Sequence, residues 1–129
     1  MALRDLVSTI AAKLSLSPAA RVTGTSTGTA VDLRGYDSAV IAVSFGAYTD
    51  GTHTPSVQHS TDGSTYTTVA AADLSGSLTA VSSSGGANSM QTVGYIGSAR
   101  YLRVVMTVTG ATTGALSSAS VIAGTPRLA

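Results

Sequence analysis

Hydrophobic and polar residues alternate along much of the chain, as they do in β-strands that bury one face. Between residues 100 and 108 every second side chain is aliphatic, namely Leu102, Val104, Met106 and Val108. Between residues 39 and 45 the larger hydrophobic side chains fall on one face, namely Ile41, Val43 and Phe45. A period of two residues places such side chains on one side of a strand, so both segments are predicted to be core strands.

Further strands are predicted where shorter runs of the same pattern lie between turn-forming residues. These runs cover residues 29–33, 56–60, 65–70, 90–96 and 115–123, and in the last of them Ala119, Val121 and Ala123 are expected to point inward. The pair Asp62-Gly63 gives the clearest hairpin turn. Residues 71–74 are expected to form one helical turn, and residues 75–89 a long surface loop. About seven short strands with regular turns predict an all-β protein, a single antiparallel β-sandwich of jelly-roll or galactose-binding-like type.

The N-terminal segment has a different spacing, which predicts a short amphipathic helical arm. Its apolar residues recur at helical intervals and form one stripe, consisting of Leu3, Leu6, Val7, Ile10 and Leu14. Arg4, Asp5 and Lys13 interrupt the apolar run, which argues against a signal peptide or a membrane span. Ser17-Pro18 is expected to end the helix. The predicted organisation is therefore an arm and linker over residues 1–21 and a sandwich over residues 22–129.

Three positions for this arm remain open. The helix can fold back on its own domain, dock on another subunit, or lie on a membrane surface. The membrane position is the least favoured because the polar face of the helix carries little positive charge.

The composition excludes several functions. The 129 residues carry 7 basic and 6 acidic side chains, so the net charge is 7 − 6 = +1. A near-neutral chain without basic clusters lacks the positive field of a nucleic-acid binder. The absence of cysteine excludes disulfide frameworks, thiolate metal sites and cysteine nucleophiles. Ala, Gly, Ser and Thr make up 72 residues, which leaves a thin core and favours a module stabilised by neighbours.

Candidate catalytic groups are few. His53 lies near Asp50 and His59 near Asp62, which allows a metal site or a general base to be considered. Both aspartates precede glycine in turns, however, where such side chains usually bond to nearby backbone. The chain has no nucleophile elbow, phosphate loop, dinucleotide fingerprint or calcium loop. We therefore expect no enzyme activity, no metal and no cofactor.

Two segments resemble a known group of sugar-binding sandwiches. The sequence Ser60-Thr-Asp-Gly-Ser-Thr-Tyr66, with Arg100-Tyr-Leu-Arg-Val104 nearer the end, looks like the hairpin and penultimate strand of discoidin-like, galactose-binding domains. Sugar-binding members usually present aromatic side chains on loops. This chain has five Tyr, one Phe and no Trp, and Tyr48 is the candidate for such a role.

A second resemblance covers about residues 31 to 127. It rests on segments that occur in a fixed order: Asp32-Leu-Arg-Gly-Tyr-Asp37, Thr49-Asp-Gly-Thr-His-Thr-Pro55, residues 60–66 with Ala70-Ala-Ala-Asp-Leu74, Tyr95-Ile-Gly97 with Arg100-Tyr101, and Gly124-Thr-Pro-Arg127. The series resembles small virion structural proteins of tailed bacteriophages. The resemblance implies a capsid decoration or cement protein that binds the major capsid protein, in the virion and, during assembly, in the host cytoplasm. Another virion position (head completion, connector or tail) and a carbohydrate-binding module are the alternatives.

The expected contacts follow from the arm and from two arginines. The arm residues Leu3, Leu6, Val7, Ile10 and Leu14 are the first candidates for contact with the capsid protein or a sister subunit. Arg100 and Arg103 are further interface candidates, although one of them is expected to pair with an aspartate on a neighbouring strand. A homo-oligomer is predicted, with a trimer at capsid three-fold positions favoured. Deletion of residues 2–16 is expected to leave a folded domain that no longer binds capsids.

Overall fold

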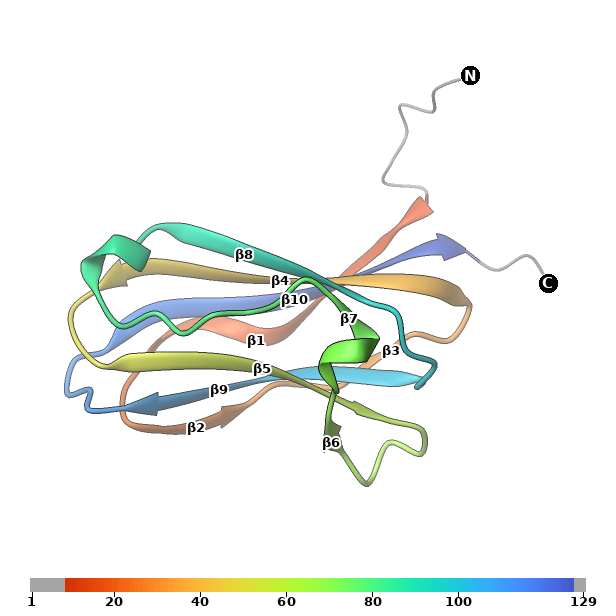
Figure 1. The fold of residues 1–129 in the computed structure, drawn as a ribbon, viewed down its shortest axis with the longest axis horizontal. Coiled ribbons are helices and arrows are strands. Elements are labelled where there is room, and N and C mark those ends of the chain that lie inside the picture. Colours follow the sequence, from red (N-terminus) through yellow and green to blue (C-terminus); the bar gives the residue numbers. More distant parts are fainter. Residues whose placement is uncertain (1–8, 127–129) are drawn as a thin grey trace, which may run out of the picture.

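The protein is a sandwich of two antiparallel β-sheets that pack face to face (Figure 1). The computed structural model describes residues 9–126. Sheet A has the order β1-β10-β4-β8-β7, and sheet B has the order β2-β9-β5-β6, with β3 also paired to β9. The strands are β1 (Ala11–Arg21), β2 (Gly24–Thr27), β3 (Val31–Asp32), β4 (Tyr36–Tyr48), β5 (Thr52–Ser60), β6 (Thr67–Thr68), β7 (Leu74–Ser75), β8 (Ser89–Tyr95), β9 (Tyr101–Thr109) and β10 (Ala115–Pro126).

The core lies between the sheets and consists of the inward side chains of the long strands. Every side chain predicted to point inward from β4, β9 and β10 is at most 4% exposed, namely Ile41, Val43, Phe45, Leu102, Val104, Met106, Val108, Ala119, Val121 and Ala123. Half of the aliphatic positions in β10 are alanines, so the two sheets meet over small side chains there. The predicted all-β antiparallel sandwich is confirmed.

The predicted turns and hairpin also appear. The Asp62-Gly63 turn joins β5 to β6, and the short 3₁₀ helix η2 (Ala71–Asp73) occupies the predicted helical turn. The long loop that follows contains a second 3₁₀ turn, η3 (Ser84–Gly86).

Strand β5 begins at Thr52, inside the expected loop, and it includes Pro55. Pro55 pairs only with β9, so its missing N–H faces a side with no neighbouring strand.

The predicted N-terminal helix is wrong where the structure describes it. Residues 11–21 form β1, an edge strand that pairs with β10 from Ala11↔Ala123 to Arg21↔Ala115. Pairing with β10 buries Leu16 and provides ladder hydrogen bonds, which outweigh the helical spacing of the apolar residues. Leu3, Leu6 and Val7 lie outside the described residues.

Strand β1 tolerates Pro18 because its ladder is interrupted there. The register shifts between Leu14 and Leu16 and again between Leu16 and Ala19, as in β-bulges. The buried Arg21 side chain binds backbone carbonyls at this point: Nη1 donates to Ser117 at 2.5 Å and Nη2 donates to Ser17 at 2.8 Å. The guanidinium thus donates hydrogen bonds to backbone carbonyls at the irregular part of the strand.

Ser15 connects the two sheets at a gap in sheet B. Strands β2 and β3 both pair with β9, and Val104 lies between their registers. The Ser15 hydroxyl accepts a hydrogen bond from the Val104 N–H at 2.9 Å and donates one to the Thr29 carbonyl at 2.9 Å. A side chain from sheet A therefore takes the place of a missing strand partner. Gly28 fits beside it because a Cβ there would overlap Ser15.

Replacing Ser15 with alanine is expected to destabilise the fold by about 1–3 kcal/mol, because it leaves a buried N–H and a carbonyl without partners. Urea unfolding of Ser15→Ala, with Ser17→Ala on the exposed part of the same strand as control, measures this cost. Equal stability of the two variants would contradict the bridging role of Ser15.

Candidate functional site

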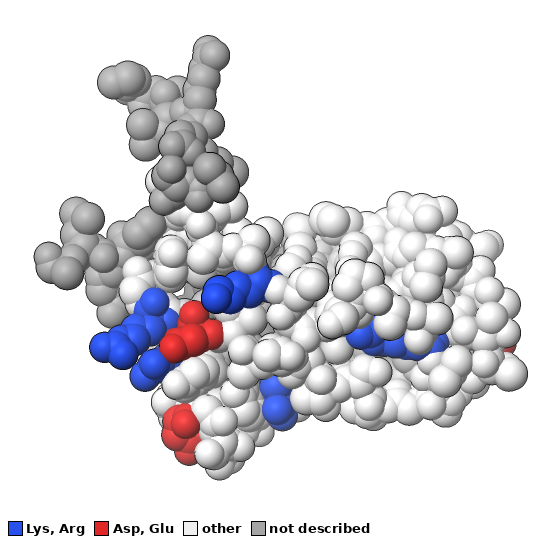
Figure 2. Space-filling view, turned by 180° about the vertical axis from the view of Figure 1, so that it is seen from behind, with Lys and Arg blue, Asp and Glu red and all other residues white. Residues whose placement is uncertain are grey.

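Most of the charged side chains visible in Figure 2 gather toward one end of the sandwich, while the opposite half of that view is mainly uncharged. We call the group formed by Asp32, Arg34, Asp37 and Arg100 the charged end. Asp32 lies on β3, Arg34 in the turn between β3 and β4, Asp37 at the start of β4, and Arg100 immediately before β9. Both signs of charge are present, so this end has no concentrated field of one sign.

Arg100 pairs with Asp32, which confirms the prediction for one of the two candidate arginines. Arg100 Nε donates to Asp32 Oδ1 and Nη2 donates to Oδ2, each at 2.8 Å. Hydrogen bonding from Arg100 lowers the pKa of Asp32 to about 2, and the same contact raises the pKa of Arg100. Both side chains are 42% exposed, so the pair contributes little to stability.

Arg103 is held in a different way. Its Nε donates to Gln58 Oε1 at 2.8 Å, and its guanidinium lies 3.8 Å from the centre of the Tyr66 ring. Tyr66 follows the Asp62-Gly63 turn, so this contact packs the hairpin against β9. The Arg103 side chain is half-buried and fixed by internal contacts.

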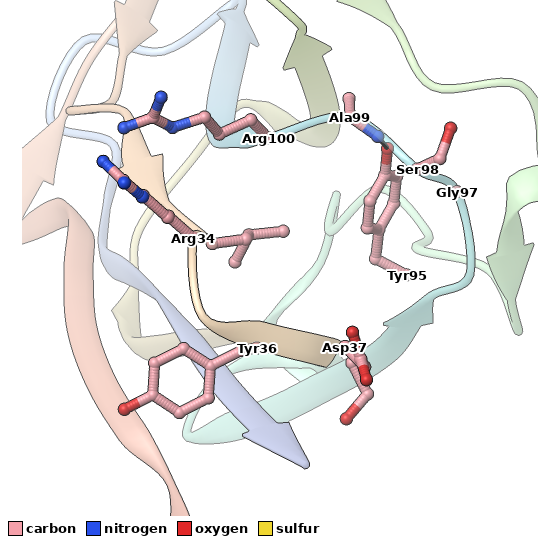
Figure 3. A pocket seen from close by; sticks show the side chains of 10 residues that line it. Arg34, Tyr36, Asp37, Tyr95, Gly97, Ser98, Ala99 and Arg100 are labelled. Atoms are coloured by element: carbon pink, nitrogen blue, oxygen red, sulfur yellow. Dashed lines mark hydrogen bonds between the residues drawn. The ribbon is translucent and has the colours of Figure 1, made fainter. Parts of the chain in front are cut away.

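An open cavity of about 420 Å³ lies at the charged end (Figure 3). The side chains of Arg34 and Arg100 lie close together on one side of it, and Tyr95 lies on the other. The Tyr95 hydroxyl accepts a hydrogen bond from the Ala99 N–H at 2.9 Å, which fixes the loop before β9. A second open cavity, of about 470 Å³, lies on the other side of this loop and includes His59, Asp62 and Asp73.

The two histidines are each held by contacts inside the sandwich. His53 is fully buried, its Nε2 donates to the Asp50 carbonyl at 3.0 Å, and its Nδ1 has no partner. His59 Nδ1 lies 2.9 Å from the Tyr95 hydroxyl and so links β5 in sheet B to β8 in sheet A. No group of three potential metal ligands occurs within residues 9–126.

The turn aspartates bind backbone, as their position before glycine predicts. Asp50 accepts from the N–H groups of Thr112, Thr113 and Gly114 across the sandwich end, which lowers its pKa. Asp62 accepts from the N–H groups of Thr65 and Ser64 and from the Ser60 hydroxyl, and these bonds lower its pKa to about 2. Both carboxylates therefore stabilise loops.

Stability is expected to fall as the pH decreases through the range of these carboxylates. The pKa values of Asp32 and Asp62 are about 2 in the folded protein, below about 3.9 for an unperturbed aspartate. Groups with a lowered folded pKa stabilise the protein above the unfolded pKa, and that contribution is lost as pH falls toward the folded value. The urea midpoint should thus be constant from pH 7 to 5 and decrease between pH 4 and 2.

Asp62→Asn tests the assignment. This variant should be less stable than the wild type at pH 7, and its urea midpoint should decrease less between pH 4 and 2. An identical decrease in both proteins would exclude Asp62 as a contributor.

Tyr48, the candidate for sugar stacking, is fixed by contacts inside the domain. Its hydroxyl donates to the Gly51 carbonyl at 2.6 Å, and its ring packs edge-on against His53 at 5.9 Å. These contacts hold the ring against the domain and do not present it on a loop for stacking on a sugar.

The outer face of sheet A is the feature that sequence reasoning missed. We define this face by the outward side chains of β1, β10, β4 and β8: Ala12, Leu14, Leu116, Ser118, Ser120, Ile122, Val40, Ala42, Ser44, Gly46, Met90, Thr92 and Gly94. None of them is charged. Four are large hydrophobic side chains that are well exposed, namely Leu14 (55%), Val40 (40%), Met90 (65%) and Leu116 (47%).

The predicted interface residues are not brought together. Leu14 lies on the outer face of sheet A, whereas Arg100 and Arg103 belong to sheet B or the loop before it. Ile10 lies just before β1 and is half-buried. The alternation of β4 and β8 places Val40 and Met90 outward, so the sequence indicates these single positions, and the sheet order is needed to join them into one face.

Comparison with known proteins supports the fold. No protein-family model and no curated protein sequence matches the chain. Among solved structures it is similar to the crystal structure of the PBSX exported protein XepA, with a TM-score of 0.57 and 20% identity over 92% of this chain and 38% of that one. It is also similar to the SPBc2 prophage-derived protein YomS, with a TM-score of 0.53 and 15% identity over 89% of this chain and 93% of that one.

Both neighbours are phage-derived proteins. At these identities the similarity establishes a shared sandwich fold. The chain spans less than two fifths of the length of XepA and nearly all of YomS.

Proposed function

We propose that this protein is a non-enzymatic structural component of a tailed-bacteriophage virion, and that it decorates the head by binding the major capsid protein. The proposal is carried by one observation: the outer face of sheet A offers an uncharged surface with four exposed hydrophobic side chains. Exposed apolar surface of this kind usually serves association with other proteins.

The polar groups favour the same function. The candidate catalytic residues are used for loops and for contacts between the sheets: Asp50 and Asp62 bind backbone, and His59 contacts Tyr95. The phage origin of two proteins with the same fold, and the order of sequence segments typical of phage virion proteins, support a role in the virion.

No helix within residues 9–126 is long and apolar enough to cross a membrane.

The copy number of the chain per particle tests the proposal. Particles from a strain that carries the gene are purified, and the chain is quantified by mass spectrometry against the major capsid protein. Hundreds of copies, in a simple ratio to capsid subunits, are expected for a decoration protein. About a dozen or fewer would indicate a head-completion, connector or tail protein instead. Absence from particles would exclude a virion role, and binding to a glycan array would then favour a carbohydrate-binding module.

The capsid contact is expected to involve the apolar N-terminal residues, and the structure changes how this must be tested. Deletion of residues 2–16 would remove Ser15 and Leu16, which are buried in the sandwich, and should unfold the protein. A variant that lacks only residues 2–8 keeps β1 and loses Leu3, Leu6 and Val7.

This shorter deletion should leave the circular dichroism spectrum and the urea midpoint unchanged and reduce co-sedimentation with undecorated heads at least tenfold. Wild-type binding by the folded deletion variant would show that residues 2–8 do not contact the capsid.

A further inference from the structure

We propose that the outer face of sheet A is the surface through which two copies of this chain pair, face to face, about a two-fold axis. This inference concerns the free protein, in which no capsid protein competes for the face, and it does not depend on a virion role. It commits to a second copy of the chain as the occupant of the face.

The extent of the face suits a dimer. Strands β1, β10, β4 and β8 lie side by side, and β4 and β10 pair from Tyr36↔Pro126 to Tyr48↔Ala115. Four strands spaced about 4.8 Å apart and about 35 Å long present roughly 700 Å². A standard interface buries about 800 Å² on each partner, so one copy of the face provides nearly the area that a stable pair needs.

The absence of charge makes the face compatible with itself. The charged residues of the described chain lie elsewhere; Lys13, for instance, pairs with the inward Val121 across the edge of sheet A. When a two-fold axis brings identical faces together, each residue meets the same surface of the other copy, so a charge on this otherwise uncharged face would find no opposite charge there. Because the face carries no charge, dimer formation would not bury an ion that lacks an opposite charge.

The face also carries both projecting side chains and a hollow. Met90 is 65% exposed and projects from β8, and its flexible thioether adapts to irregular surfaces. An open hollow of about 330 Å³ lies between β1, β4 and β10 and is lined by Pro18, Ser44, Gly46, Leu116 and Ser118, among others. A projection and a hollow on one face are what a two-fold interface requires, because residue i of one copy contacts residue j of the other in both directions.

Pairing through the strand edge is disfavoured. Strand β1 is the long free edge of sheet A, and it contains two register shifts and Pro18. Bulges and proline at an edge prevent the addition of another strand. Association through sheet A is therefore expected to use its face.

Two matched pairs of variants test this interface. Val40 lies on the face at 40% exposure and Val22 lies off it at 49%, so Val40→Asp and Val22→Asp make the same change at similarly exposed positions. Met90 and Ile96 are both 65% exposed, and only Met90 lies on the face, so Met90→Asp and Ile96→Asp form the second pair. Each face variant places a carboxylate in the interface twice, once from each copy.

Size-exclusion chromatography with light scattering, over a range of concentrations, gives the mass of each protein. The wild type should form a dimer of about 25 kDa, which is 2 × 12.7 kDa. Met90→Asp and Val40→Asp should raise the dissociation constant at least tenfold, and the two controls should leave it unchanged. If circular dichroism shows that Val40→Asp fails to fold, the comparison of Met90→Asp with Ile96→Asp still tests the interface.

A wild-type monomer at high concentration would overturn the proposal. A trimer would also overturn it, since face-to-face pairing closes with two copies. The same conclusion follows if folded face variants and controls associate equally well.

Discussion

Replacing Leu102 with alanine is expected to destabilise the protein by about 2–5 kcal/mol, because the substitution removes three carbon atoms from the centre of the core and leaves a cavity. Leu102 is fully buried on β9, where it lies opposite Val31 on one side and His59 on the other. The small side chains around the core, alanines above all in β10, have little volume with which to fill a cavity. Domains of this size have total stabilities of about 5–15 kcal/mol, so the loss is a large fraction.

Urea unfolding of Leu102→Ala and Ile96→Ala measures this effect. Ile96 is 65% exposed, so its truncation should change the free energy of unfolding by at most about 0.5 kcal/mol. Comparable losses in the two variants would mean that Leu102 does not lie at the centre of the core.

The long strands were predictable because every second side chain along them is hydrophobic and because turn-forming residues separate them. Strands β9 and β4 bury the residues that alternation places on one face, and the Asp62-Gly63 turn fixes the register of the hairpin that follows. The sequence also predicted that Arg100 or Arg103 pairs with an aspartate on a neighbouring strand, and Arg100 does so because Asp32 lies on β3, which pairs with β9.

The N-terminal strand could not be predicted from local pattern. The apolar spacing up to Leu14 favours a helix, and Pro18 indicates an interruption in either structure. Long-range contacts determine that this segment is a strand. Backbone hydrogen bonds join it to β10, and the Arg21 side chain donates to backbone carbonyls near the bulges. The Ser15 hydroxyl accepts a hydrogen bond from the Val104 N–H, which has no strand partner on that side. None of these three contacts is encoded within a window of ten residues.

The candidate interface was predicted only in part for a related reason. Val40 and Met90 were assigned to strands, but an exposed hydrophobic residue gains meaning only when neighbouring strands place others beside it. Sheet order brings β1, β10, β4 and β8 together from distant parts of the sequence. The surface therefore appears once the topology is known.

Replacing Gly114 with alanine is expected to destabilise the protein by about 4 kcal/mol or more. Gly114 has φ = +78°, and a Cβ at this position would overlap the carbonyl oxygen of Arg21. The loop cannot move away, because the Gly114 N–H donates to Asp50 at 2.6 Å and its carbonyl accepts from the Thr49 N–H at 2.9 Å. The Arg21 backbone is equally fixed by its pairing with Ala115.

Gly110 provides the control that separates backbone strain from this overlap. It begins the same loop with φ = +65°, and no atom lies within 4 Å of a Cβ built there. Gly110→Ala should therefore incur only the left-handed backbone penalty of about 1–2 kcal/mol. If urea unfolding gives the same loss for both variants, the close approach of Gly114 to Arg21 contributes nothing. A much larger loss for Gly114→Ala shows that the loop between β9 and β10 positions the edge strand β1 on the sandwich.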